Sequence, residues 1–182
     1  FISHTFGEEE FFEKTFEELG IKNISCEQIL EKYRQLIINR TRIDDDVAKA
    51  FKFLRRKRIK IALLTNESVD RIKSFIRKVE IAKLLDAVVI SEQVQIEKPN
   101  PAIFIEASKR LKVRCEEIVM FGDNERKDGG ARQVGMKFVL VTAYKNPEWQ
   151  WGKELIIQPD YVIRKVEKKE IEKCLKNLNN NP

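Results

Sequence analysis

The 182-residue sequence contains little cysteine, one histidine and no long run of apolar residues. Its three cysteines, Cys26, Cys115 and Cys174, are far apart, odd in number and outside any C-x-x-C pattern. This usage does not fit a disulfide framework or a cysteine-rich metal site, and it favours reduced thiols in the cytoplasm. No apolar segment approaches the length of a membrane-spanning helix, and no signal-peptide pattern opens the chain. We therefore expect a cytoplasmic protein without a membrane partner.

The composition indicates neither disorder nor a surface dedicated to nucleic acid. Hydrophobic residues make up 42% and charged residues 35% of the chain, as in a globular protein with its own core. The formal net charge is +6, but lysine and arginine are interleaved with glutamate along the expected helices. We interpret the stretch RRKR at 55–58 as the solvated end of a helix, with nucleic-acid contact as the less favoured alternative.

The hydrophobic pattern predicts three helices and then an alternation of strands and helices. The expected helices cover 8–19, 26–37, 44–57, 68–81, 100–111, 127–135 and 168–178, and the expected strands cover 59–65, 86–91, 116–121, 137–142 and 160–163. Continuous apolar strands separated by helices indicate a parallel sheet covered on both faces. We predict an α/β fold, a Rossmann-like doubly wound parallel sheet, with residues 44–182 as the core domain and residues 1–43 as a small helical cap.

Polar side chains follow three of the expected strands, at the edge of the sheet where ligands bind in such folds. In chain order they are Thr65, Asn66, Glu92, Lys98, Asp123 and Asp128. The two aspartates repel each other unless positive charge balances them. Carboxylates with water suit Mg²⁺, which takes few protein ligands and a substrate phosphate, while Lys98 can neutralise phosphate and Thr65 can donate a hydrogen bond to it.

This ordered set resembles the haloacid dehalogenase (HAD) superfamily of hydrolases from about Val47 to Ile163. LLTN is similar to the second motif of that family, EKPNPAIF to the third, and FGDNERKDGGARQVGMKFVLV to the fourth. The fourth is the specific one, because its acids, its glycines and the following strand all match.

The resemblance implies roles for individual residues. Asp123 and Asp128 would bind Mg²⁺, Thr65, Asn66 and Lys98 would be catalytic, and the substrate would be a small phosphorylated molecule. Among the catalytic residues, Lys98 would steady the nucleophile and the phosphate, and Thr65 would bind the transferring phosphoryl group.

One part of the family pattern is absent. The family's nucleophile is the first aspartate of a D-x-D motif at the end of a first strand, which lies between the strands that here end at Thr65 and near Asp123. The nearest candidate, Asp44-Asp45-Asp46, follows polar residues and is interpreted as a helix N-cap cluster. A parallel sheet without its central strand leaves backbone groups unpaired. We therefore expect that the sequence lacks this strand of roughly ten residues.

Three functions remain open. We favour a magnesium-dependent phosphatase that works through an aspartyl-phosphate intermediate. A 2-haloacid dehalogenase is the alternative within the family, but its fourth motif usually has a serine-asparagine pair in place of Gly122-Asp123. A relative without catalysis, serving as a binding module, would explain the absent nucleophile.

The candidate residues also have simpler structural explanations. Asp123 and Asp128 would then be a turn acid and a helix cap, Thr65 would cap the next helix, and Lys98 would be an ordinary loop lysine. His4, the one histidine, is interpreted as a surface residue and not as a general base. Trp149 and Trp151 are expected to pack a loop onto the body.

Overall fold

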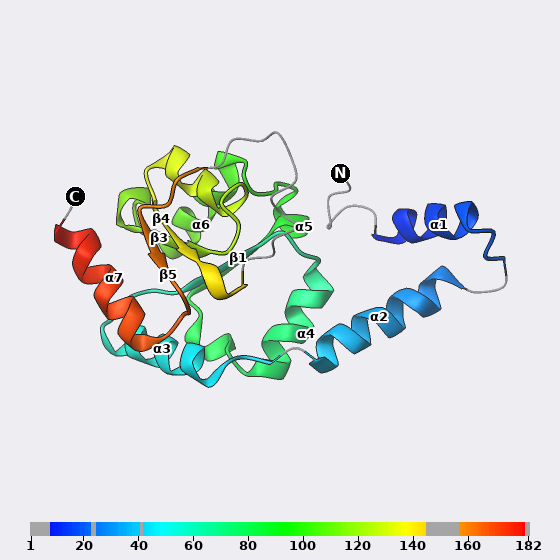
Figure 1. Ribbon diagram of the computed structural model, residues 1–182, viewed down its shortest axis with the longest axis horizontal. Coiled ribbons are helices and arrows are strands. Elements are labelled where there is room, and N and C mark those ends of the chain that lie inside the picture. Colours follow the sequence, from blue (N-terminus) through cyan, green and yellow to red (C-terminus); the bar gives the residue numbers. More distant parts are fainter. Residues whose placement is uncertain (1–7, 23–24, 41, 145–156, 181–182) are drawn as a thin grey trace.

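The computed structural model describes residues 8–22, 25–40, 42–144 and 157–180. Its α-helices are α1 (Glu8–Glu18), α2 (Cys26–Arg40), α3 (Asp45–Arg56), α4 (Val69–Val79), α5 (Ser91–Val94), α6 (Pro101–Leu111) and α7 (Lys168–Asn180). Its strands are β1 (Ala62–Thr65), β2 (Ala87–Ile90), β3 (Val119–Gly122), β4 (Lys137–Val141) and β5 (Tyr161–Ile163). The 3₁₀ segments are η1 (Ala82–Leu84), η2 (Cys115–Glu117), η3 (Asp128–Val134) and η4 (Thr142–Tyr144). The predicted order of elements is confirmed (Figure 1).

The helix ends follow from side chains that replace missing backbone partners. Asp44 caps α3, because its carboxylate accepts a 3.0 Å hydrogen bond from the backbone N–H of Asp46. Ser68 caps α4 and Asn100 caps α6 in the same way. The acidic cluster at the start of α3 is thus a cap, as the sequence predicted.

The strands form two parallel sheets instead of the single sheet that we predicted. β1 pairs with β2, and β3, β4 and β5 pair in that order. Among the described residues, no strand pairs with the second edge of β1 or of β3. The division falls where the resemblance to the family implies an additional strand. Backbone groups at edges without a neighbouring strand are left without sheet partners.

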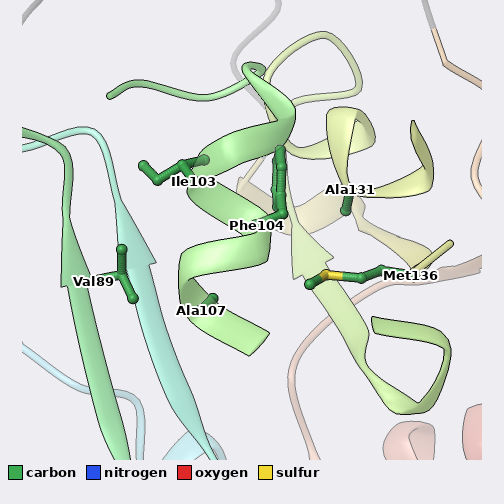
Figure 2. Packing of buried hydrophobic residues seen from close by; sticks show 6 residues of the cluster. All are labelled: Val89, Ile103, Phe104, Ala107, Ala131 and Met136. Carbon is green, nitrogen blue, oxygen red and sulfur yellow. The ribbon is translucent and has the colours of Figure 1, made fainter. Parts of the chain in front are cut away.

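The core covers both faces of the longer sheet. Alternate residues of β3 point to opposite faces, so Met120 packs against one buried cluster while Val119 and Phe121 pack against the other. The first cluster contains Val89, Ile103, Phe104, Ala107, Ala131 and Met136 (Figure 2). Figure 2 shows α6 between the strand that carries Val89 and the segment that carries Ala131 and Met136, so this helix joins the two sheets.

The second cluster lies under the C-terminal helix. Val139, Val141 and Ile163 pack there against Cys174 of α7. Helix α7 also contacts α3, where the ammonium of Lys168 lies 5.3 Å from the ring centre of Phe53. Parallel strands with helices packed on them confirm the predicted Rossmann-like α/β class.

Helices α1 and α2 extend from the body on the side of α4 (Figure 1). Helix α2 packs against α1 and α4, and Leu30 is buried there, whereas Leu19 and Leu36 are exposed. The division into a cap of residues 1–43 and a core of residues 44–182 stays a prediction. In the described part of the chain, no helix combines the length and the apolar composition needed to cross a bilayer.

Candidate active site

The predicted residues lie around the carboxyl ends of β1 and β3. Thr65 is the last residue of β1, with Asn66 next to it, and Gly122 is the last residue of β3, followed by Asp123. Asp128 opens η3. Parallel strands bring their carboxyl ends to one edge, so the two strands deliver these side chains from either side of the division between the sheets.

Lys98 connects the two sides. Its ammonium lies 2.6 Å from a carboxylate oxygen of Asp128 and 3.5 Å from the carbonyl oxygen of Leu64 in β1. The side chains of Lys98 and Asp128 are only 12% and 4% exposed. Two buried opposite charges at this distance depend on each other, because either one alone would be left in the interior without compensation. Lys98 is therefore not an ordinary solvated loop lysine.

The main chain holds Asp128 from the other side. Its second carboxylate oxygen accepts a 3.1 Å hydrogen bond from the backbone N–H of Asn124. The Asn124 side chain in turn accepts bonds from the backbone N–H groups of Arg126 and Lys127, which closes the turn after β3. Asn124 was not predicted as a site residue, although an asparagine directly after a strand and Asp123 is typical of an asparagine turn.

Gly122 makes room for Asp128. A Cβ atom at Gly122 would lie 2.2 Å from a carboxylate oxygen of Asp128, well inside van der Waals contact. Gly130 is similarly confined, since a Cβ there would lie 2.6 Å from the carbonyl oxygen of Pro99. Gly122 thus allows η3 to approach the end of β3 closely, and Gly130 allows the segment with Pro99 to approach η3.

Asn66 binds the backbone of Lys98 through both ends of its amide. Its Nδ2 donates to the Lys98 carbonyl oxygen at 3.0 Å, and its Oδ1 accepts from the Lys98 N–H at 2.9 Å. The two residues are 32 positions apart in the chain, so no local spacing in the sequence predicts this pair.

Asp123 has a raised pKa in this environment. Burial is the largest cause, and the negative charge of Asp128 adds to it, while the charge of Lys98 opposes it. The ionised form of Asp123 is therefore destabilised, and a cation beside it would relieve that cost.

The simpler explanation for Thr65 does not hold. Helix α4 is capped by Ser68, whose hydroxyl accepts from the N–H of Arg71 at 3.4 Å. Glu92, which lies in α5, supports the same helix end by accepting a 2.7 Å bond from the N–H of Val69. Thr65 is thus not the cap of α4, and the carboxylate of Glu92 is already bonded to the N-terminal end of that helix.

The residues at this edge fit a magnesium ion with few protein ligands. Asp123 and Asp128 are hard oxygen donors, and Mg²⁺ keeps several waters beside one or two carboxylates. In the described part of the chain, no group of three or more His, Cys, Asp or Glu side chains could hold a metal together. His4, Trp149 and Trp151 lie outside the described residues.

Comparison with known proteins identifies the family. Residues 4–141 match the haloacid dehalogenase-like hydrolases. The chain belongs to this family. The resemblance found in the second, third and fourth motifs is thereby confirmed.

Individual relatives include both phosphatases and dehalogenases. The glyceraldehyde 3-phosphate phosphatase of Methanopyrus kandleri is 38% identical over 97 residues, which cover 53% of this chain and 42% of that protein. The (S)-2-haloacid dehalogenase 2 of a Pseudomonas species is 30% identical over 118 residues, 65% of this chain and 50% of that protein. The structure of a HAD phosphatase from Thermococcus onnurineus has a TM-score of 0.69 at 26% identity, with 94% of this chain and 71% of that chain covered. The chain spans about half the length of the curated relatives it matches.

Proposed function

We propose that this HAD-like hydrolase is a magnesium-dependent phosphatase that acts on a small phosphate ester through an aspartyl-phosphate intermediate. The observation that carries the proposal is the buried Lys98–Asp128 ion pair beside Asp123, at the edge where β1 delivers Thr65. Relatives named as phosphatases support it. With a Mg²⁺ ion on the two carboxylates, the ammonium and the hydroxyl would complete a site suited to a substrate that is itself anionic.

The residues of this chain would bind and orient the phosphoryl group. The Thr65 hydroxyl donates a hydrogen bond to a phosphoryl oxygen, and the ammonium of Lys98 supplies positive charge at the same edge. Because Lys98 is already held on Asp128, it needs little reorganisation when the anion arrives. Asn66 belongs to the same predicted catalytic set and adjoins Thr65 in the chain.

Asp123 and Asp128 would hold the magnesium ion. When bound, the ion would neutralise phosphate charge and act as a Lewis acid on a phosphoryl oxygen. The raised pKa of Asp123 supports this assignment, since burial and the Asp128 carboxylate penalise the charge of Asp123 until a cation arrives. With two carboxylates alone the affinity for Mg²⁺ should be weak, because the ion loses its water reluctantly.

The nucleophile would stand between the two sheets. In the family, that carboxylate ends a strand between those corresponding to β1 and β3, and the described residues place no strand there. This feature also favours the alternative of a binding module without catalysis. The intact set of Thr65, Lys98, Asp123 and Asp128 speaks against it.

The proposal extends to the cap over the site and to the cellular compartment. Helices α1 and α2 would form a two-helix cap, which leaves a fairly open pocket for a small molecule. We also propose the cytoplasm as the compartment, where thiols stay reduced. In the described part of the chain, none of Cys26, Cys115 and Cys174 forms a disulfide.

A 2-haloacid dehalogenase is the second candidate, because two of the relatives carry that name. The two functions separate in an assay of the protein that includes the expected nucleophile strand, with phosphate esters and 2-haloacids, each with and without EDTA. We expect release of phosphate that EDTA abolishes. Halide release that EDTA does not affect would overturn the proposal, and no turnover of either class would favour the binding module.

A further inference from the structure

We propose that Asn66 is a positioning residue, whose carboxamide fixes the backbone of Lys98 so that the ammonium of Lys98 stays at the division between the two sheets. Two hydrogen bonds, of 3.0 and 2.9 Å, join this one side chain to the carbonyl oxygen and the N–H of Lys98. Both lie in a partly buried setting, where water competes weakly for the same groups.

The chemistry of the side chain explains why asparagine suits this place. A carboxamide offers a donor and an acceptor on neighbouring atoms, so it can satisfy both backbone groups of one residue. Aspartate would keep the acceptor and lose the donor. Lys98 lies between α5 and α6, outside both sheets, so no strand fixes its backbone.

The contacts of Lys98 define a path from β1 to η3. Its backbone is held by Asn66, which directly follows β1, while its ammonium reaches Asp128 at 2.6 Å. The ammonium also lies 3.5 Å from the carbonyl oxygen of Leu64. Without the Asn66 amide, the backbone of Lys98 loses both of these hydrogen bonds, and the ammonium then samples positions away from Asp128.

A positioning role differs from general support of the fold in what it changes. If Asn66 only supported the fold, its loss would raise the acetylation rate of all lysines through lower stability. If Asn66 positions Lys98, its loss raises the acetylation rate of Lys98 alone. Lys60 is an internal reference, because its ammonium is held by a single bond of 2.7 Å to the carbonyl oxygen of Leu111, away from the site. Asn100 provides the matched control variant, since its amide oxygen accepts a bond from the N–H of Ala102 and, among the described residues, its side chain is not bonded to the Lys98 backbone.

The first test measures the rate of acetylation of Lys98 relative to Lys60 in the full chain, by acetic anhydride and mass spectrometry. In Asn66→Ala we expect the ratio to rise on the order of tenfold, the factor that corresponds to about 1.4 kcal/mol of lost hydrogen bonding. In Asn100→Ala we expect no change. An unchanged ratio in Asn66→Ala, or an equal rise in both variants, would overturn the inference.

The second test rests on the proposed function and uses inorganic phosphate in the presence of Mg²⁺, with affinity measured by calorimetry. We expect Asn66→Ala and Lys98→Met to weaken phosphate binding to a similar extent, and the double variant to be no weaker than Lys98→Met. Additive losses would mean that Asn66 does not act through Lys98. If Lys98→Met leaves phosphate affinity unchanged, the proposed function fails, while the acetylation ratio still decides the role of Asn66.

Discussion

Asp128 is the residue on which the contacts of the candidate site converge. It receives the ammonium of Lys98, accepts the N–H of Asn124 and occupies the space that Gly122 leaves open. It is also 3% exposed as a residue, so its charge depends on these partners. At this scale the sequence pattern placed Asp123 and Asp128 in the candidate site, but it did not show that Asp128 is more deeply buried than Asp123.

Replacing Lys98 by Met removes the positive partner of Asp128 with little change in side-chain length. We expect the free energy of unfolding to fall by about 3 kcal/mol at neutral pH, because a buried carboxylate is left without compensation. Urea denaturation measures this loss. The double variant Lys98→Met/Asp128→Asn should recover most of it, and a single variant as stable as the wild type would show that the pair is effectively solvated.

The raised pKa of Asp123 predicts a dependence of stability on pH. The folded protein holds this proton to higher pH than the unfolded chain, whose carboxyl titrates near the ordinary value of 3.8. The free energy of unfolding therefore decreases as pH rises from that value through the raised folded pKa, and at neutral pH the folded state carries the penalty. Asp123→Asn should be more stable than the wild type at neutral pH without Mg²⁺, and it should lack this part of the slope.

Urea denaturation of both proteins across acidic to neutral pH checks this prediction. Parallel stability curves for the wild type and Asp123→Asn would show that the folded state does not shift the titration of Asp123.

At the scale of the elements, hydrophobic periodicity predicted nearly every helix and strand, because burial decides both. Two details differ. The predicted short helix at 127–135 is the 3₁₀ segment η3, in which adjacent Gly129 and Gly130 weaken an α-helix and permit close packing. The four-residue helix α5 was expected as the end of a strand and a loop, since a segment so short carries no periodic signal.

Helix α6 should contribute to stability mainly through the face that carries Phe104, which is buried between the two sheets. Phe104 is 0% exposed in the cluster between the two sheets, whereas its neighbour Ile105 is 40% exposed. We expect Phe104→Ala to lower the free energy of unfolding by about 4 kcal/mol and Ile105→Ala to change it by less than about 0.5 kcal/mol. Thermal and urea denaturation of the two variants provide the comparison. Similar losses in both would contradict the packing of α6 between the sheets.

The approach of η3 to the end of β3 depends on Gly122. Alanine there would place a methyl group 2.2 Å from the Asp128 carboxylate, so that carboxylate and its ion pair must move. We expect Gly122→Ala to lower stability by about 1–3 kcal/mol. In an Asp128→Gly background the same substitution should cost less, because both the carboxylate and the Cβ atom of residue 128, which would lie 2.5 Å from the new methyl group, are gone. Equal losses in the two backgrounds, measured by urea denaturation, would exclude the clash as the cause.

At the scale of the whole molecule, the division between β1 and β3 is the main departure from the predicted single sheet. The resemblance to the HAD family nevertheless implied this division, because the family's first strand lies at this place and was expected to be absent from the sequence. The contacts of Lys98 at this division were not predictable in the same way. The Asn66–Lys98 and Lys98–Asp128 pairs join residues 32 and 30 positions apart, and only the folded chain brings them together.

The most direct test of the proposed site is the change in melting temperature that Mg²⁺ produces in the wild type and in Asp123→Asn. Binding to the folded state alone adds about 1.4 kcal/mol at a concentration roughly ten times the Kd, which corresponds to about 3–6 °C for a chain of this size. We expect this rise in the wild type and none in Asp123→Asn. An equal rise in both proteins would mean that Asp123 does not bind the metal, and the magnesium-dependent site proposed at this edge would be wrong.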